Sequence, residues 1–212
     1  MNKINYDKKM QKAMNKIPVG TKLLLHVCCA PCLTYCLTRL VQHFDVTLYY
    51  ANDNIDTKDE WQKRLDEVAR LVDVVNNGKY EVVPSYPVKL VVKDYNGEHF
   101  AMWARHFADQ AEGEYRCTRC FAMRLGDAHE YARKNGFEYF ATTLTVSQYK
   151  NSEMLNLVGY EIDKEGGAKW LPTDFKKNYG YDQSIVLSNK YELYRQHYCG
   201  CRFSKAGEEI EK

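Results

Sequence analysis

Apolar residues fall into short runs that alternate with longer stretches of helical spacing. Runs of strand length occur at residues 22–27, 46–51, 80–84 and 137–144. Helix-like patterns occupy residues 33–43, 57–76, 118–135 and a segment that begins near 152. Residues 88–110 are ambiguous but mostly helical, with an interruption at Asn96-Gly97, and residues 170–204 contain no clear strand. Strands that alternate with helices predict parallel βαβ units.

The stretch at residues 57–76 has the clearest helix pattern. Thr57 and Glu60 have the spacing of a capping box, in which each side chain bonds the other's backbone amide. Apolar residues from Trp61 onward recur at steps of three and four, and Gly78 follows as a stop signal. We expect this apolar stripe to belong to the core.

The pattern predicts an α/β protein with a parallel sheet of about four or five strands. Ligands of such folds bind beyond the carboxyl ends of the strands. Chemistry is therefore expected in the loops after Val27, Ala51 and Leu144. No linker or repeat is visible, so residues 1–212 are interpreted as one domain. Its expected parts are a basic N-terminal extension (1–21), an α/β core (22–168) and a helical or loop cap (169–205) over the functional edge.

Composition places the chain among ordinary globular proteins. It has 45% hydrophobic and 27% charged residues and a formal net charge of +2, which excludes disorder. No apolar run approaches the ~18 to 20 residues that a membrane span requires, and the polar opening lacks the apolar part of a signal peptide. We therefore expect a cytoplasmic protein with no membrane partner.

Charge is concentrated at the ends of the chain. Residues 1–22 contain six lysines and one acidic residue, and residues 169–205 contain seven basic residues and three acidic ones. The segment between them is acidic overall. Basic ends suit contacts with nucleic acid phosphates, although solvated surfaces have the same composition.

Cysteines carry the main chemical signal. Seven of the eight form three groups: Cys28, Cys29 and Cys32; Cys117 and Cys120; Cys199 and Cys201. The eighth, Cys36, lies on the first helix expected after residue 27 and is interpreted as a buried structural thiol. Because soft thiolates select iron–sulfur clusters or zinc, the three groups predict a shared metal site.

Other interpretations use some of these cysteines. A structural zinc site needs four ligands and leaves a surplus. A thioredoxin-like thiol-disulfide oxidoreductase would use Cys29 and Cys32 alone, between a strand and a helix. Cys199 and Cys201, with only a glycine between them, could form a strained, redox-active disulfide.

The loop after the first strand argues against ATP binding. Phosphate-binding loops present backbone amides from glycine-rich turns. Residues 26–32 contain no glycine, and Pro31 removes one amide. His26 precedes the cysteine pair and is interpreted as a residue that packs or orients a neighbour rather than a ligand.

Four segments together resemble one family. They are residues 24–32, 115–125, 142–147 and 194–204, and residues 182–188 add to the match. This order of motifs resembles the QueH type of epoxyqueuosine reductase over residues 22–204. The resemblance implies a fold like that of the adenine nucleotide alpha hydrolases, with metal ligands in place of the nucleotide loop.

The resemblance also implies an activity and its cofactors. The family reduces the epoxide of epoxyqueuosine at the wobble position of tRNA, with two electrons from a donor protein or reductant, and no cobalamin is expected. A 4Fe-4S cluster would be held by Cys28, Cys29, Cys117 and Cys120. Cys199 and Cys201 would form a redox-active pair, or join Cys32 around an adjacent mononuclear iron.

Secondary candidates surround these cysteines. His197, Tyr198 and Arg202 flank the Cys-Gly-Cys and are proton-donor candidates. Asn52 and Asn54 follow the second strand and are candidates for contact with the substrate base or for turn formation. A non-enzymatic iron–sulfur or zinc protein that binds RNA remains the alternative from another functional class.

Overall fold

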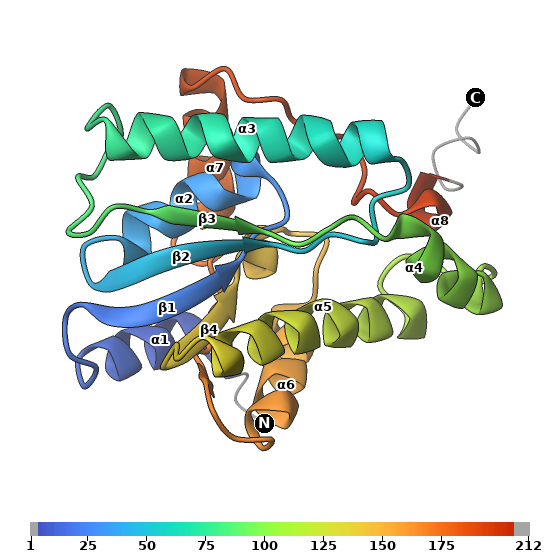
Figure 1. Ribbon diagram of the computed structural model, residues 1–212, viewed down its shortest axis with the longest axis horizontal. Helices are drawn as coiled ribbons and strands as arrows, with labels where there is room; N and C mark the ends of the chain where they lie inside the picture. Colours follow the sequence, from blue (N-terminus) through green and yellow to red (C-terminus); the bar gives the residue numbers. More distant parts are fainter. Residues whose placement is uncertain (1–3, 206–212) are drawn as a thin grey trace.

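A five-stranded, all-parallel sheet forms the centre of the protein (Figure 1). The structure is a computed structural model that describes residues 4–205. The sheet has the order β3-β2-β1-β4-β5, and its strands are β1 (Thr21–His26), β2 (Phe44–Tyr50), β3 (Lys89–Val92), β4 (Tyr139–Thr142) and β5 (Lys169–Trp170). The predicted α/β class is confirmed.

Helices cover both faces of the sheet. They are α1 (Tyr6–Met14), α2 (Ala30–Leu40), α3 (Lys58–Asn76), α4 (Gly97–Ala104), α5 (Tyr115–Lys134), α6 (Ser152–Asp163), α7 (Gly180–Lys190) and α8 (Arg202–Lys205). The described residues also contain two short 3-10 turns, η1 (Arg105–Phe107) and η2 (Thr143–Val146). Helix α2 packs against α3 and α7, and α5 packs against α6 and β1. In Figure 1, α3 lies above the sheet and α5 and α6 lie below it.

Strand β1 shows why two hydrophobic clusters form. Side chains alternate between the faces of a strand. Leu23, Leu25 and Val27 accordingly join the cluster under α2 and α3, whereas Leu24 joins Phe140 on the face covered by α5. The apolar run on this strand is nearly continuous because helices bury both of its faces.

Helix α3 begins where its capping sequence predicts. The side chain of Thr57 accepts a hydrogen bond from the backbone N–H of Glu60 at 3.2 Å. Trp61, Val68 and Leu71 are buried on the inner side of the helix. The predicted core stripe is therefore confirmed.

The strand predicted at residues 80–84 is wrong. The third strand is β3, which lies inside the segment 88–110 that the pattern assigned mostly to helix and which pairs with β2 at the edge of the sheet. Pro84 offers no N–H to a ladder. Tyr80 instead buries its ring, and its hydroxyl donates to the carbonyl oxygen of Thr34 on α2. Helix α4 then starts after its N-cap Asn96, at the predicted interruption.

The N-terminal basic segment is partly a packed helix. Met10 of α1 belongs to the hydrophobic cluster under α2, and buried Asp7 forms an ion pair with Arg39 at 3.0 Å. Residues 1–3 of that segment lie outside the described part of the chain. The segment 169–205 likewise contains β5 besides helices, so it is not free of strands. The division into extension, core and cap stays a prediction.

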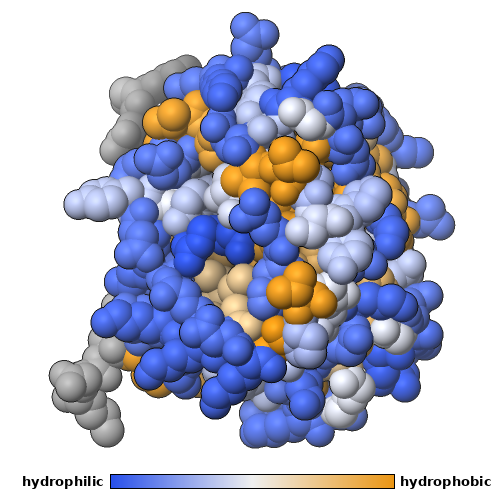
Figure 2. Space-filling view, turned by 90° about the vertical axis from the view of Figure 1, so that its left-hand side faces the viewer, coloured by the Kyte–Doolittle hydropathy of each residue, from blue (hydrophilic) through white to orange (hydrophobic). Residues whose placement is uncertain are grey.

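The strand order changes direction at β1, which lies between β2 and β4. The chain proceeds from β1 to β2 and β3 on one side, and returns to β4 and β5 on the other. The crevice between β1 and β4, at their carboxyl ends, is the usual ligand position in such folds. The side of the protein where the strands begin faces the viewer in Figure 2. Hydrophobic residues appear there in small groups between hydrophilic ones. None of the described helices is long and apolar enough to cross a membrane.

Candidate functional site

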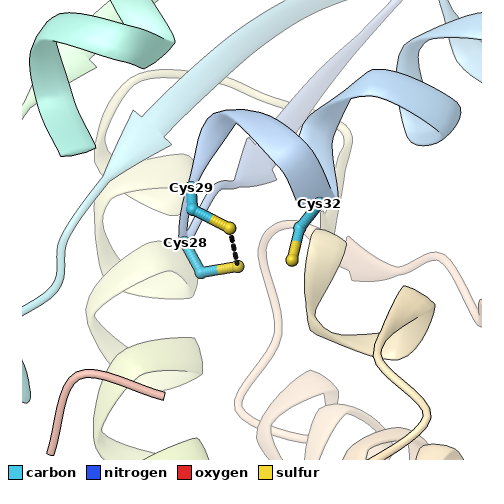
Figure 3. Close-up of side chains that lie close together, drawn as sticks. All are labelled: Cys28, Cys29 and Cys32. Atoms are coloured by element: carbon cyan, nitrogen blue, oxygen red, sulfur yellow. Dashed lines mark hydrogen bonds between the residues drawn. The ribbon is translucent and has the colours of Figure 1, made fainter. Parts of the chain in front are cut away.

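Three cysteine sulfurs converge at the carboxyl end of β1 (Figure 3). Cys28 follows the strand, Cys29 is the extended N-cap of α2, and Cys32 lies in the first turn of that helix. Their Sγ atoms all lie within 4.8 Å of one another, and those of Cys28 and Cys29 are 3.7 Å apart. The strand-to-helix turn therefore presents three soft ligand atoms on one side.

The three thiols differ in acidity. A hydrogen bond from the Cys29 thiol, with further help from Cys32, holds the pKa of Cys28 well below its ordinary value. The same bond raises the pKa of Cys29 to about 12, and hydrogen bonds to Cys28 and Cys29 raise the pKa of Cys32 well above its ordinary value. Cys28 is thus the first thiolate of the group, and its partners solvate the charge. Thiolate is the form that binds metals.

The second cysteine pair lies at the start of α5. Cys117 and Cys120 are one helical turn apart and therefore share a face. Cys120 is buried, and burial raises the pKa of its thiol to about 11. The Cys117 sulfur accepts a hydrogen bond from the N–H of Gly113 at 3.2 Å.

The third pair is held by two distant elements. Gly200, with φ of +109°, lets the Cys-Gly-Cys turn, and its carbonyl oxygen accepts a hydrogen bond from the N–H of Asp56 at 2.9 Å. Arg64 of α3 donates to the carbonyl oxygen of Cys199 at 3.2 Å. Cys201 is buried and packs in one cluster with Cys120. The fold thus brings the C-terminal pair to the pair on α5.

A cavity of about 590 Å³, here called the main cavity, connects the groups. It is lined by Cys28, Cys32 and Cys199, and by the ionisable residues Arg64, Glu112, Arg124, Lys150, Arg195 and His197. A smaller space of about 60 Å³, the side cavity, is lined by Cys117, Cys120, Cys199 and Cys201. Six of the seven grouped cysteines therefore line the two cavities, and the sulfur of the seventh, Cys29, lies 3.7 Å from that of Cys28.

Cys36 and His26, which lie close in sequence to the first cysteine group, have structural roles. Cys36 is buried and its thiol donates to the carbonyl oxygen of Cys32 at 3.2 Å, as expected of a structural thiol. His26 is buried, and burial lowers the pKa of its ring to about 3. The neutral ring lies 2.9 Å from the hydroxyl of Thr142 and 3.4 Å from the carbonyl oxygen of Ala51. It joins β1 to the ends of β4 and β2, which agrees with an orienting role.

The secondary candidates separate into two sets. His197 and Tyr198 line the main cavity. Arg202 lies elsewhere and pairs with Asp56 at 2.7 Å. Asn54 is buried at the side cavity, with no hydrogen-bond partner for its Oδ1 within residues 4–205. Asn52 is 1% exposed and both ends of its amide are bonded inside the protein, so it holds the loop rather than a substrate base.

The donor set fits a thiolate-bound metal group. None of the eight cysteines, all within the described residues, forms a disulfide. Three sulfurs are already close enough for one metal ion, and four more line the adjoining spaces. Cysteine sulfur is the ligand that zinc and iron–sulfur centres share. The triad thus forms a potential metal site, and the division of the seven cysteines between a cluster and a second centre stays a prediction.

Several cavity residues were not found from sequence. Arg124 lies one turn after Cys120 on α5, so helical spacing could have placed it on the same face. Lys150 and Glu112 come from loops and lie 3.9 Å apart across the cavity wall. Their positions carry no local signal, because only the packing of α5 against α6 brings those loops together.

Comparisons with known proteins agree with this arrangement. The family model described as epoxyqueuosine reductase QueH matches residues 23–207. Relatives named epoxyqueuosine reductase QueH occur in Streptococcus pyogenes, at 39% identity with 99% of this chain and 81% of the relative covered, and in Staphylococcus aureus, at 39% with 99% and 87% covered. The one from Thermotoga maritima is 33% identical, with 88% of this chain and 91% of the relative covered.

Proposed function

Because the chain belongs to the epoxyqueuosine reductase QueH family, it is an oxidoreductase, and we propose that it reduces the epoxide of epoxyqueuosine at the wobble position of tRNA. The reaction takes two electrons and two protons and gives the cyclopentene and water. The convergence of Cys28, Cys29 and Cys32 beside a cavity large enough for a nucleoside is the observation that carries the proposal.

Four cysteines would hold a 4Fe-4S cluster in this proposal: Cys28, Cys29, Cys117 and Cys120. The turn after β1 and the first two turns of α5 present these thiols, and the lowered pKa of Cys28 favours its thiolate form. When bound, such a cluster would supply electrons one at a time, and an adjacent iron would supply a Lewis acid for the epoxide oxygen. Cys32, Cys199 and Cys201 would serve that iron, or the last two would form a redox pair.

The residues around the main cavity bind and enclose the substrate. Arg195 lines the cavity and is held by a 3.1 Å hydrogen bond from its Nη1 to the hydroxyl of Ser188. Basic side chains that line a cavity attract the phosphates of an anticodon loop. His197 and Tyr198 also line this cavity, where a ring nitrogen or a phenol hydroxyl can deliver a proton to the oxygen that leaves carbon.

The proposed partners follow from the reaction. They are a tRNA carrying epoxyqueuosine and an electron-donor protein or chemical reductant. We infer a cytoplasmic location because free thiols and tRNA are both found there. We also propose that cobalamin takes no part, so the assay should proceed in mixtures that contain none.

The test is purification without oxygen, followed by iron, sulfide and zinc analysis and an assay on epoxide-bearing tRNA. We expect brown protein with iron and acid-labile sulfide, and conversion of the epoxide with a strong one-electron reductant. Changing Cys28, Cys29, Cys117 or Cys120 to Ala should lower cluster content. Cys36→Ala is the matched control, because Cys36 is a buried thiol that lines neither cavity, and it should keep its cluster. Fully active protein with stoichiometric zinc and no sulfide would refute the cluster, and iron–sulfur protein that binds this tRNA without turnover would refute the activity.

A further inference from the structure

Arg124 occupies the wall between the two cavities. It lies on α5, one turn beyond Cys120, and lines the main cavity and the side cavity alike. Only 6% of the residue is exposed. A guanidinium in this position is therefore withdrawn from solvent and directed at the cysteine-lined spaces.

No carboxylate lies within ion-pair distance of Arg124 among residues 4–205. None of the ion pairs in that range includes this residue. Its Nη2 donates to the Oδ1 of Asn52 at 2.5 Å, but its Nε is buried and has no hydrogen-bond partner. Buried arginines are normally paired, because an isolated charge is costly to remove from water. The site therefore favours negative charge that comes from cysteine thiolates and from any group bound to them.

Asn52 fixes the direction of the guanidinium. Its amide nitrogen donates to the carbonyl oxygen of Val27 at 2.9 Å, which holds its oxygen toward Arg124. Val27 directly precedes Cys28, so one short chain of bonds connects the first cysteine loop to α5. The planar fork of an arginine retains its orientation once one nitrogen is bonded.

Cysteines from two groups surround this charge. Arg124 interacts electrostatically with Cys28 and with Cys120, which come from the end of β1 and the start of α5. A metal group held by thiolates from both elements would carry net negative charge next to the guanidinium. Its negative charge would then lie beside a guanidinium that no carboxylate pairs.

We propose that Arg124 is the cationic positioning residue of the cysteine-bound cluster and raises its reduction potential. Each added electron makes a thiolate-bound cluster more negative, so a fixed cation nearby stabilises the reduced form more than the oxidised form. Hydrogen bonds from N–H groups to the sulfurs act in the same direction. The inference rests on the proposed function, since it takes the bound group to be a redox-active cluster.

The test is a redox titration of the purified, cluster-loaded protein, followed by absorbance or by the electron paramagnetic resonance signal of the reduced cluster. Arg124→Gln removes the charge and should shift the midpoint potential to more negative values. Arg124→Lys keeps the charge but loses the fork, so its shift should be smaller. Asn52→Ala leaves the charge without its orienting bond and should shift the potential in the same direction, which keeps the test available if Arg124→Gln does not fold.

Arg133→Gln is the matched control. Arg133 lies on the same helix, but it is half-exposed and paired with Glu130 at 2.8 Å. Its removal should leave the potential unchanged. A structural role for Arg124 would lower cluster content or stability without moving the potential of the clusters that remain.

Two results would overturn the inference. An unchanged potential in both Arg124→Gln and Asn52→Ala refutes it while leaving the cluster and the reductase activity intact. Weakened binding of epoxide-bearing tRNA in Arg124→Gln, with no change of potential, would assign the residue to substrate phosphate instead. Absence of iron and sulfide from the wild-type protein would show instead that the proposed cluster is wrong.

Discussion

The Nη1 atom of Arg64 donates a hydrogen bond to the carbonyl oxygen of Cys199 at 3.2 Å, across 135 residues of sequence. Arg64 is only 2% exposed, and Glu60 on the same helix accepts a hydrogen bond from its Nε at 2.7 Å. The ring of Tyr198 lies 5.2 Å from its guanidinium carbon. Helix α3 therefore fixes the Cys-Gly-Cys segment at the edge of the main cavity.

Arg64→Gln should misplace Cys199 and Cys201. A hydrogen bond from a charged donor contributes about 1.5 to 3 kcal/mol, so we expect kcat/KM to fall roughly ten- to a hundredfold. Iron bound by the other cysteines should remain. Steady-state kinetics and iron analysis check this, with Gln62→Ala as the control, because Gln62 is on the exposed side of the same helix. Unchanged kinetics in Arg64→Gln would show that the bond does not position the segment.

Gly200→Ala should destabilise the same segment. At φ of +109° an L side chain is strained, and a Cβ there would lie 3.0 Å from Cγ1 of Ile55 and 3.1 Å from Nη1 of Arg64. We expect a loss of about 1 to 3 kcal/mol in the free energy of unfolding, measured by denaturant titration.

The control for Gly200→Ala is Gly126→Ala, for which we expect a change of opposite sign in the free energy of unfolding. Gly126 lies within α5, and a Cβ there would meet no atom within 4 Å. Alanine is the better helix former by up to about 1 kcal/mol, so Gly126→Ala should raise the free energy of unfolding. Equal effects at the two glycines would mean that backbone conformation and close contacts do not matter at Gly200.

Cys32 can be tested by two substitutions with different expected outcomes. If Cys32 ligates a second metal, Cys32→Asp should keep its cluster and a measurable part of the activity, because carboxylate oxygen also binds ferrous iron. Cys32→Ala should keep the cluster and lose most activity. Turnover on epoxide-bearing tRNA and iron content are measured for both. Inactive Cys32→Asp with full iron would rule out the ligand role, and an almost harmless Cys32→Ala would indicate a merely buried thiol.

Binding of tRNA should depend steeply on salt if the basic segments contact phosphate. Lys177 is exposed in the loop between β5 and α7, the helix whose Ser184 lines the main cavity. Lys177→Gln should lower the slope of log affinity against log salt by about 0.7 to 0.9. Lys134 lies at the C-terminal end of α5, whereas the cysteine pair lies near the start of that helix. Lys134→Gln should therefore leave the slope unchanged. A slope that is flat in wild type would refute phosphate contacts altogether, including those predicted for residues 1–22.

Local patterns in the sequence predicted most of the elements and the candidate ligands. The cap at Thr57, the apolar alternation in β1 and the motifs that hold Cys28 and Cys120 all depend on near neighbours along the chain, so the sequence alone is enough to recognise them. The strand prediction at residues 80–84 was wrong for the same reason. That segment contains an apolar run, but Lys89–Val92 is the segment that pairs with β2 at the edge of the sheet. Strand propensity alone does not determine which of two short apolar runs pairs with a neighbouring strand.

Only the tertiary structure determined how distant groups meet. It formed the main cavity beside Cys28, brought Cys201 to Cys120, and buried Arg124 against Asn52 from the loop after β2. These contacts depend on the sheet order and on helix packing, which set the neighbours of residues far apart in the chain. The sequence therefore identified the candidate ligands of the predicted metal site, and the fold placed the charge of Arg124 beside them.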